Sequence, residues 1–486
     1  MSEEIRNLEP KLLWEHFYSL TQIPRPSKKE EKVRAFMKKF GEDLGLETIE
    51  DEVGNIIIRK PATPGMEDRK GVVMQGHLDM VPQANSDSNH NFETDPIEAY
   101  IDGDWVTAKG TTLGADNGMG VAAAMAVLSS NDIEHPLVEG LFTIDEEAGM
   151  TGANYLKPGI LKGDILLNMD SEDEGELYVG CAGGEDANVS LPYTEENMPS
   201  DYKGYKLSVT GLKGGHSGMD IPLGRGNANK IMFRLFNKAI DAMDLRVSEV
   251  NGGSLRNAIP REGFAIVGVP SAKASEFETF VKEYAATIQN ELSGSDPGVK
   301  VEVVTADLPA KAIAKDTFRK FTDAIMACPN GVIRMSDAME GLVETSTNLA
   351  VVKTENGELI AQALMRSSVD TARDELAERM ISTFRLAGAK VELDGAYPGW
   401  KPNMDSEILK VMQKTYEDNW GKIPEIKAIH AGLECGILGS AYPNWDMISY
   451  GPTIRYPHSP DEKVQIETVG KFWEWTVKTL KNIPKK

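Results

Sequence analysis

The N-terminal part of the chain, up to about residue 180, alternates between two apolar patterns, and this alternation restricts the possible folds most strongly. Residues 12–20 and 30–45 have the spacing of amphipathic helices, and the small residues of 116–130 are typical of a helix packed closely on a sheet. Short apolar runs bounded by turn residues indicate buried strands at 55–60, 71–81, 135–147 and 164–170. Together these segments predict an α/β domain with a mostly parallel sheet.

Composition narrows the class of protein further. The chain has 486 residues, enough for two to four domains, and its net charge of −23 argues against nucleic acid or an anionic membrane as a partner. Its three cysteines lie far apart and cannot build a disulfide framework, so we expect a cytoplasmic location. The acidic N-terminus does not resemble a secretory signal, and no run approaches the ~18 apolar residues of a membrane span.

Side chains that can bind metal ions stand at the ends of the predicted strands and in nearby turns. They are His77, Asp116, Glu146, Glu147, Asp170 and His458. Ligand sites in parallel sheets form at the carboxyl ends of strands, where most of these residues lie. Two imidazoles and three carboxylates can hold two divalent cations if one carboxylate bridges them, and one glutamate then remains to move a proton. The set therefore predicts a two-metal hydrolase.

The immediate neighbours of these residues fit the same chemistry. Asp79 stands two residues after His77, so in an extended segment its carboxylate can reach the back of the imidazole and fix the tautomer. Asp116 lies in a stiff Gly-rich turn, which suits a bridging ligand. A metal on one carboxylate of the Glu146–Glu147 pair would relieve their repulsion, and the other could act as a general base.

Each of these positions also has a purely structural interpretation. His77 could simply end a strand, Asp116 could cap a helix, the Glu146–Glu147 pair could be solvated, and Asp170 could be a turn residue. The metal interpretation depends on their occurrence together. It also requires that the C-terminal segment return to the first domain, so that His458 joins the other ligands.

A second domain is expected in the middle of the chain. From about residue 185 to 399 the sequence contains strands rich in Val and Ser, long charged helices and Gly-rich turns. If His458 and His77 share one site, this middle segment is an insertion. We therefore predict a catalytic two-metal domain of residues 1–184 and 400–486, interrupted by an inserted α+β domain of residues 185–399.

The motifs and their order resemble a known family of enzymes. GHLDMV, LGADNGMG, IDEEAGMTGA, LNMDSE, GGHSG, HAGLECG and YPHSP are similar to the motifs of the co-catalytic di-zinc peptidases, which include carboxypeptidase G, peptidase T and peptidase V. The similarity is greatest to those members that cleave Xaa-His dipeptides, and it runs from the N-terminal helix to the last strand. It implies a zinc-peptidase-like catalytic domain, with residues 185–399 as a lid.

The resemblance also implies a metal content. Two Zn²⁺ ions per chain are expected, and Mn²⁺ or Co²⁺ can occupy the same nitrogen and oxygen ligands. His77 and Asp170 would bind one ion, and Glu147 and His458 would bind the other. Asp116 would bridge the two ions.

The remaining assignments concern the reaction and the substrate. By resemblance, Glu146 would be the general base, with Asp79 supporting His77. The implied substrate contacts are His216, Asn257 and Arg366 in the lid and His430, Gly432 and Glu434 on the catalytic side. The chemistry is reasonable, because the arginine fork binds a free carboxylate and a His or Asn donor can stabilise an oxyanion.

The expected activity is the hydrolysis of Xaa-His dipeptides such as β-alanyl-histidine, in which Glu146 takes the proton of a metal-bound water. The expected partner is a small dipeptide, and a homodimer through the lid is an open alternative. A broader di- or tripeptidase, an aminoacylase, and a non-catalytic metal- or peptide-binding protein are the competing functions.

Overall fold

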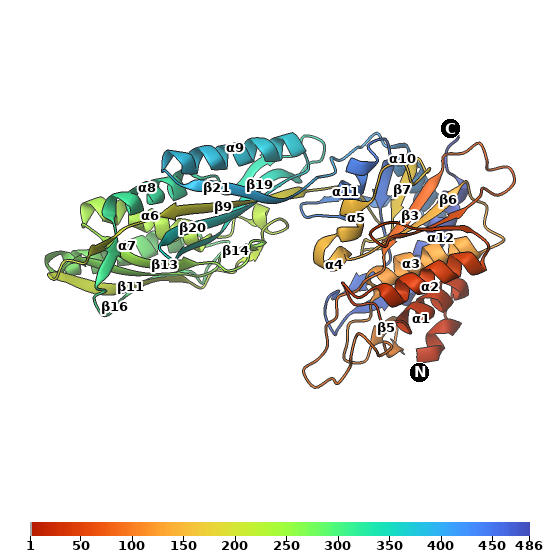
Figure 1. Ribbon diagram of the computed structural model, residues 1–486, viewed down its shortest axis with the longest axis horizontal. Coiled ribbons are helices and arrows are strands. Elements are labelled where there is room, and N and C mark those ends of the chain that lie inside the picture. Colours follow the sequence, from red (N-terminus) through yellow and green to blue (C-terminus); the bar gives the residue numbers. More distant parts are fainter. Residues whose placement is uncertain (1) are drawn as a thin grey trace. The chain divides into compact units, whose positions relative to one another are not determined.

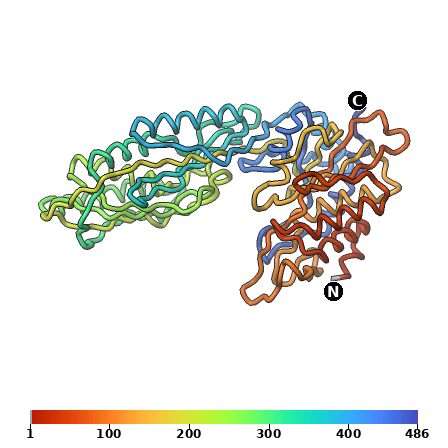
Figure 2. The backbone as a smooth tube through the Cα atoms, viewed as in Figure 1, coloured from red at the N-terminus to blue at the C-terminus, as the bar shows by residue number. Residues whose placement is uncertain are grey.

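The computed structural model describes residues 2–486, which form two compact units. Unit 1 comprises the chain up to Gly180, Pro402–Ala428 and Leu433–Lys486, and unit 2 comprises Cys181–Lys401 and Ile429–Gly432. Figure 2 shows that unit 1 combines the red-to-orange start of the chain with its blue end. Residues 181–184, 400–401 and 429–432, which the sequence prediction placed in the first domain, group with unit 2. None of the described helices has the length and hydrophobicity needed to cross a bilayer.

The main sheet of unit 1 has parallel strands at its centre. Across the sheet the order is β1 (Glu47–Glu50), β2 (Ile56–Lys60), β6 (Val138–Thr143), β3 (Val72–His77), β7 (Ile165–Asn168), β23 (Asp446–Ser449), β8 (Glu176–Cys181) and β22 (Glu425–Ile429). β6, β3, β7 and β23 run parallel, and β1, β2 and β8 pair antiparallel with their neighbours. β3 and β6 are buried along their whole length, as strands covered on both faces are. The predicted mostly parallel α/β sheet is confirmed.

The helix α3 (Ala115–Ser129) packs on β3 at close range because both elements carry small residues. A Cβ on Gly120 would lie 2.5 Å from the carbonyl oxygen of Met169, and one on Gly76 would lie 2.3 Å from Oδ1 of Asn117. The other helices of unit 1 are η1 (Ser2–Asn7), α1 (Lys11–Thr21), α2 (Glu31–Asp43), α4 (Glu146–Gly149), α5 (Thr151–Tyr155), α10 (Glu407–Trp420), α11 (Glu434–Ala441) and α12 (Ile466–Lys481).

A smaller sheet holds the C-terminal segment in unit 1. Its strand order is β24 (Ile454–Arg455), β25 (Lys463–Gln465), β5 (Trp105–Ala108) and β4 (Ala99–Asp102). β25 pairs antiparallel with β5, with Val464 opposite Val106. The loop between β24 and β25, which contains His458, is therefore anchored to a hairpin that precedes α3.

Unit 2 contains a large antiparallel sheet whose helices pack on one face (Figure 1). The strand order is β16 (Lys300–Thr305), β11 (Tyr202–Thr210), β15 (Gly263–Pro270), β13 (Arg246–Gly252), β19 (Val343–Glu355), β20 (Glu358–Ser367), β9 (Gly183–Pro192) and β21 (Lys390–Tyr397), with β18 (Gly331–Met335) beside β19. The helices are α6 (Ala228–Ala242), α7 (Ala274–Glu291), α8 (Lys315–Ala327) and α9 (Asp370–Leu386). Phe233, Phe236, Phe318 and Phe321 lie in the core that these helices share with the sheet. Short elements complete the unit: β10 (Glu195–Asn197), β12 (Gly215–His216), β14 (Ala258–Ile259), β17 (Lys311–Ile313), η2 (Ile221–Leu223) and η3 (Ser271–Lys273).

The sheet of unit 2 is built from two repeats of a βαββαβ motif. In the first repeat, β11–α6–β13–β15–α7–β16, the spatial order is β16-β11-β15-β13; in the second, β9–α8–β19–β20–α9–β21, it is β21-β9-β20-β19. The first repeat is inserted after β9, and the repeats meet where β13 pairs antiparallel with β19.

The sequence suggests that residues 206–240 and 358–388 are two related strand-then-helix units. The structure places them in different repeats but at non-equivalent positions. The first corresponds to β11–α6, whose counterpart is β9–α8, and the second to β20–α9, whose counterpart is β15–α7. The suggested pairing is wrong because a strand followed by a helix occurs twice in each repeat, and local pattern does not separate the two occurrences.

Candidate metal centre

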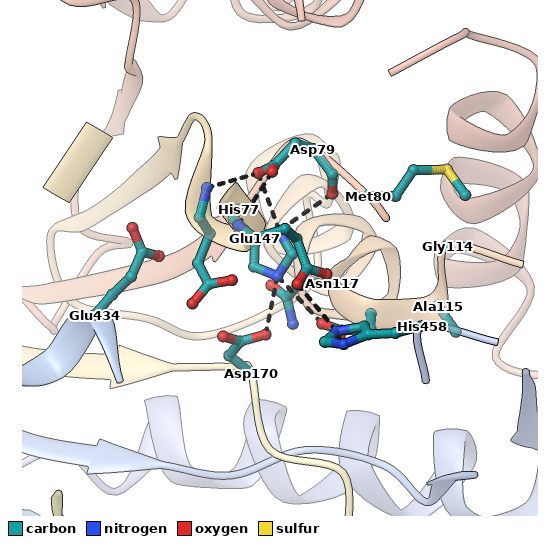
Figure 3. Close-up of polar contacts among 12 residues, drawn as sticks. His77, Asp79, Met80, Gly114, Ala115, Asn117, Glu147, Asp170, Glu434 and His458 are labelled. Carbon is teal, nitrogen blue, oxygen red and sulfur yellow. Dashed lines mark hydrogen bonds and ion pairs between the residues drawn. The ribbon is translucent and has the colours of Figure 1, made fainter. Parts of the chain in front are cut away.

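The candidate metal ligands of unit 1 come from separate elements that meet at one edge of the main sheet. His77 is the last residue of β3, Asp170 follows β7, and Glu147 lies in α4 directly after β6. Asp116 lies in the first turn of α3, and His458 lies in the loop between β24 and β25. Figure 3 shows the side chains of His77, Asp170 and His458 directed toward one another.

Asp116 stands between the two imidazoles. Its Oδ1 lies 3.1 Å from Nε2 of His77, and its Oδ2 lies 3.1 Å from Nε2 of His458. Nε2 of His77 is also 3.3 Å from Oδ1 of Asp170, and Nε2 of His458 is 3.0 Å from Oε2 of Glu147. Two groups result, His77–Asp116–Asp170 and Asp116–Glu147–His458, each with ligand atoms close enough to surround one metal ion.

The electrostatics of this cluster fit a cation in each group. Hydrogen bonds to Asp116 and Glu147 raise the pKa of His458 to about 11, which shows how strongly the surrounding carboxylates favour a positive charge at this position. Burial raises the pKa of Asp170 to about 6. Oε1 of Glu147 is buried without a hydrogen-bond partner among the described residues. Imidazole nitrogens and carboxylate oxygens are the donors that Zn²⁺, Mn²⁺ and Co²⁺ accept.

Asp79 fixes the orientation of two of these elements. Its Oδ1 lies 3.3 Å from Nδ1 of His77, and its carbonyl oxygen lies 3.1 Å from the same nitrogen. The Asp79 carboxylate also accepts the backbone N–H groups of Glu146 and Glu147 at 3.0 and 3.2 Å, and the hydroxyl of Ser27 at 2.8 Å. A single carboxylate therefore orients the imidazole and holds the start of α4.

Glu146 and Glu147 do not lie on the strand that the sequence suggests. β6 ends at Thr143, and the two glutamates open the short helix α4 after Asp145, whose φ is 53°. The turn was missed because the run 135–147 is apolar almost to its end. Burial raises the pKa of Glu146 well above its usual value, and the negative charges of Asp170 and Glu434 add to the shift. Glu146 lies outside the two groups around Asp116, although its carboxylate is near His77 and Glu147.

The predicted substrate contacts of unit 2 lie around a short hairpin formed by β12 and β14. Nδ1 of His216 accepts the N–H groups of Gly218 and Met219 at 3.2 and 3.1 Å, so the proton of the neutral ring is on Nε2. Asn257 precedes β14, and its carbonyl accepts the N–H of Ser217 at 2.8 Å. His216 therefore presents an N–H donor.

Arg366 and His430 lie near this hairpin within unit 2. Arg366 is buried and donates from Nε to the hydroxyl of Ser217 at 3.3 Å and from Nη1 to the hydroxyl of Tyr397 at 3.0 Å. Burial, together with the charge of Arg366, lowers the pKa of His430 to about 3, so this ring is neutral. Its Nε2 lies 2.7 Å from the hydroxyl of Ser346. Sequence reasoning did not single out Ser217, Ser346 or Tyr397, because lone hydroxyl residues give no distinctive pattern.

Glu434 and Gly432 belong to different units. Glu434 is fully buried in unit 1 at the start of α11, where its carboxylate accepts the amide of Gln75 at 2.6 Å and the hydroxyl of Thr143 at 2.9 Å. Burial raises its pKa to about 7. Gly432 is half-buried and is the last residue of the segment that groups with unit 2.

Comparison with known proteins shows the family of the chain. The model of peptidase family M20/M25/M40 matches residues 73–482, and the chain belongs to this family. The chain is 46% identical to the cytosol non-specific dipeptidase of Escherichia coli (strain K12) over 486 residues, which cover 99% of this chain and 100% of that protein.

Solved structures show the same fold. The crystal structure of aminoacylhistidine dipeptidase from Vibrio alginolyticus is 49% identical, with a TM-score of 0.96 and 100% of both chains covered. A tripeptidase from Staphylococcus aureus shares the fold with a TM-score of 0.57 at 16% identity, covering 98% of this chain and 99% of that chain. The family resemblance inferred from the motifs is confirmed.

Proposed function

We propose that this chain is a cytosolic metallo-dipeptidase that hydrolyses Xaa-His dipeptides of the β-alanyl-histidine type. The observation that supports this most strongly is the position of Asp116, which offers one carboxylate oxygen to each of two imidazoles. The names of the relatives from E. coli and V. alginolyticus support the dipeptide substrate, and the first of these names supports the cytosol.

The proposed cofactor is a pair of Zn²⁺ ions, for which Mn²⁺ or Co²⁺ can substitute. His77 and Asp170 would hold one ion and Glu147 and His458 the other, with Asp116 shared between them. When bound, the ions would polarise the scissile carbonyl and lower the pKa of water.

Glu146 is the proposed general base. Its carboxylate would take a proton from the attacking water and return it to the nitrogen of the leaving amine. The raised pKa of Glu146, caused by burial, suits a group that must hold this proton between the two steps. Asp79 would keep His77 and α4 in place during the reaction.

We propose that unit 2 acts as the lid and supplies the contacts that recognise a dipeptide. The guanidinium of Arg366 would bind the terminal carboxylate, and the Nε2–H of His216, with Asn257, would donate to the developing oxyanion. His430, Gly432 and Glu434 are further proposed substrate contacts. A homodimer through the lid belongs to this proposal, and light scattering on the purified protein tests it.

A broader dipeptidase is the second candidate function, and the name of the E. coli relative, a non-specific dipeptidase, favours it. In that case the histidine side chain of the substrate would contribute little to binding. A panel of Xaa-His dipeptides, other dipeptides, tripeptides and N-acyl amino acids distinguishes these specificities.

The central experiment measures β-alanyl-histidine hydrolysis together with metal content per chain, before and after chelation. We expect about two ions per chain, loss of activity on chelation and its return with added Zn²⁺, Mn²⁺ or Co²⁺. Protein that binds two ions and a dipeptide but does not cleave it would contradict the enzymatic function.

A further inference from the structure

Arg25 is a buried cation next to the candidate metal centre, yet it contacts none of the metal-facing atoms. Its side chain is almost fully buried. Nη1 donates to the carbonyls of Leu78 and Asp79 at 2.9 and 3.0 Å, and Nη2 donates to the carbonyl of Gly114. The guanidinium therefore joins the segment that follows His77 to the turn that precedes Asp116.

Glu462 holds the same turn through its backbone N–H groups. Its buried carboxylate accepts the amides of Leu113 and Gly114 on Oε2, at 2.7 and 2.9 Å, and those of Ala115 and Asp116 on Oε1, at 2.8 and 3.1 Å. Glu462 stands four residues after His458 in the same loop. The carboxylate therefore ties the His458 loop to the turn that carries Asp116.

The glycines around Asp116 leave the space that Arg25 occupies. A Cβ on Gly114 would lie 2.5 Å from Nη2 of Arg25, and a Cβ on Gly118 would lie 2.8 Å from the same nitrogen. The packing of Arg25 therefore explains why both positions in the LGADNG motif are glycine. By sequence alone this motif resembles a phosphate-binding turn. Burial lowers the pKa of Arg25, and the negative charge of Glu462 partly offsets this effect.

We propose that Arg25 and Glu462 are positioning residues that together hold Asp116 between His77 and His458. Arg25 binds the carbonyl of Gly114 and two carbonyls of the segment after His77. Glu462 binds the backbone N–H groups of residues 113–116. The three segments that carry Asp116, His77 and His458 are all held by one or both of these residues. This inference rests on the proposed function, because it assigns the pair a role in metal binding.

Conservative substitutions should disrupt this arrangement. Lysine keeps the charge of Arg25 but lacks the planar fork that reaches carbonyls of two segments. Glutamine keeps the size of Glu462 but presents its NH₂ group to backbone N–H donors, so about half of the four bonds are lost. Supporting residues around metal ligands typically change metal affinity by 10–100-fold when replaced.

A second buried Arg–Glu pair in unit 1 offers a matched control. Glu139 is fully buried, binds Nε of Arg59 at 2.7 Å and accepts the backbone N–H groups of Lys162 and Gly163 at 2.7 and 2.8 Å. Arg59 donates to the carbonyl of Ile160 at 2.9 Å. Like Arg25 and Glu462, these two residues are buried and bind backbone groups, but they also bind each other directly and contact no candidate metal ligand.

The experiment compares R25K and E462Q with R59K and E139Q. Metal-free full-length protein is titrated with Zn²⁺ in competition with a chromophoric chelator, and the melting temperature of each metal-free variant is recorded. We expect R25K and E462Q to bind Zn²⁺ at least about tenfold more weakly than wild type, with R59K and E139Q within about twofold of it.

Two results would overturn the inference while leaving the proposed function intact. In the first, R25K and E462Q bind Zn²⁺ as wild type does. In the second, all four variants lose affinity in proportion to their loss of melting temperature, which indicates general destabilisation. Wild-type protein that binds no Zn²⁺ would reject the proposed function itself and the inference with it.

Discussion

Asp116 shows how much of this site depends on single side chains. Its carboxylate faces one imidazole with each oxygen, while its backbone N–H is bound by Glu462. Hydrogen bonds from His458 and His77 hold the pKa of Asp116 below its usual value in spite of burial. The residue is therefore ionised and fixed in orientation, which a bridging ligand requires.

At this scale, the sharpest prediction concerns the two adjacent glutamates. Glu146→Gln should keep its metal ions and lower kcat by at least about 100-fold, because glutamine has the same shape but cannot accept the proton. Metal analysis and steady-state kinetics on β-alanyl-histidine measure both effects.

The matched variant is Glu147→Gln, which removes a proposed ligand and should lose metal as well as activity. Near-normal turnover of Glu146→Gln would remove Glu146 from the role of base. Loss of metal from both variants to the same extent would show that the two glutamates do not differ in function.

At the scale of elements, the turn before α3 is the most constrained segment. Gly114 has a φ of 71° and lies against Arg25 and Met80, and four successive amides around it bind one carboxylate. A side chain at Gly114 would be disfavoured for two independent reasons: the left-handed backbone conformation and the lack of space for a Cβ atom.

Gly114→Ala tests this constraint, with Gly103→Ala as the control. Gly103 also has a positive φ, 58°, but a Cβ there would meet nothing within 4 Å. Gly103→Ala should cost about 1 kcal/mol of stability from backbone strain alone. Gly114→Ala should cost about 1–3 kcal/mol more, because Arg25 and Met80 must move. Urea unfolding of the metal-free variants measures the difference, and equal losses would contradict the packing argument.

At the scale of the whole molecule, the candidate residues are divided between two units with separate sheets. Every candidate metal ligand belongs to unit 1, whereas His216, Asn257, Arg366 and His430 belong to unit 2. The repeats of unit 2 form a continuous sheet with its own core. We therefore expect substitutions in unit 2 to leave the metal ligands of unit 1 in place.

The division predicts separable effects of substitutions. Arg366→Ala should lower kcat/KM for dipeptides by about 10–100-fold, as expected for a lost charge-assisted hydrogen bond to a carboxylate, and leave metal content unchanged. Arg256→Ala is the control in the same unit. Arg256 is also an arginine that binds side chains of its own unit, Asp186 and Asn188, but it has no proposed contact with substrate. An Arg366→Ala variant as active as Arg256→Ala would contradict carboxylate binding by Arg366.

Much of unit 1 was predictable from local pattern. Apolar runs before His77 and Asp170 indicate buried strands, and parallel strands present their carboxyl ends at one edge. The type and order of the motifs indicated the family. The metal-binding and substrate-binding roles of the individual residues remain predictions.

The long-range contacts could not be predicted from the sequence. The pairing of β25 with β5 helps to bring the His458 loop next to α3, and only the packed structure shows that Arg25 and Glu462 meet at one turn. The grouping of residues 429–432 with unit 2 and the correspondence of its repeats were equally hidden. Strand and turn patterns are encoded by neighbouring residues, whereas these contacts join segments that are distant in the sequence and depend on the burial of whole elements.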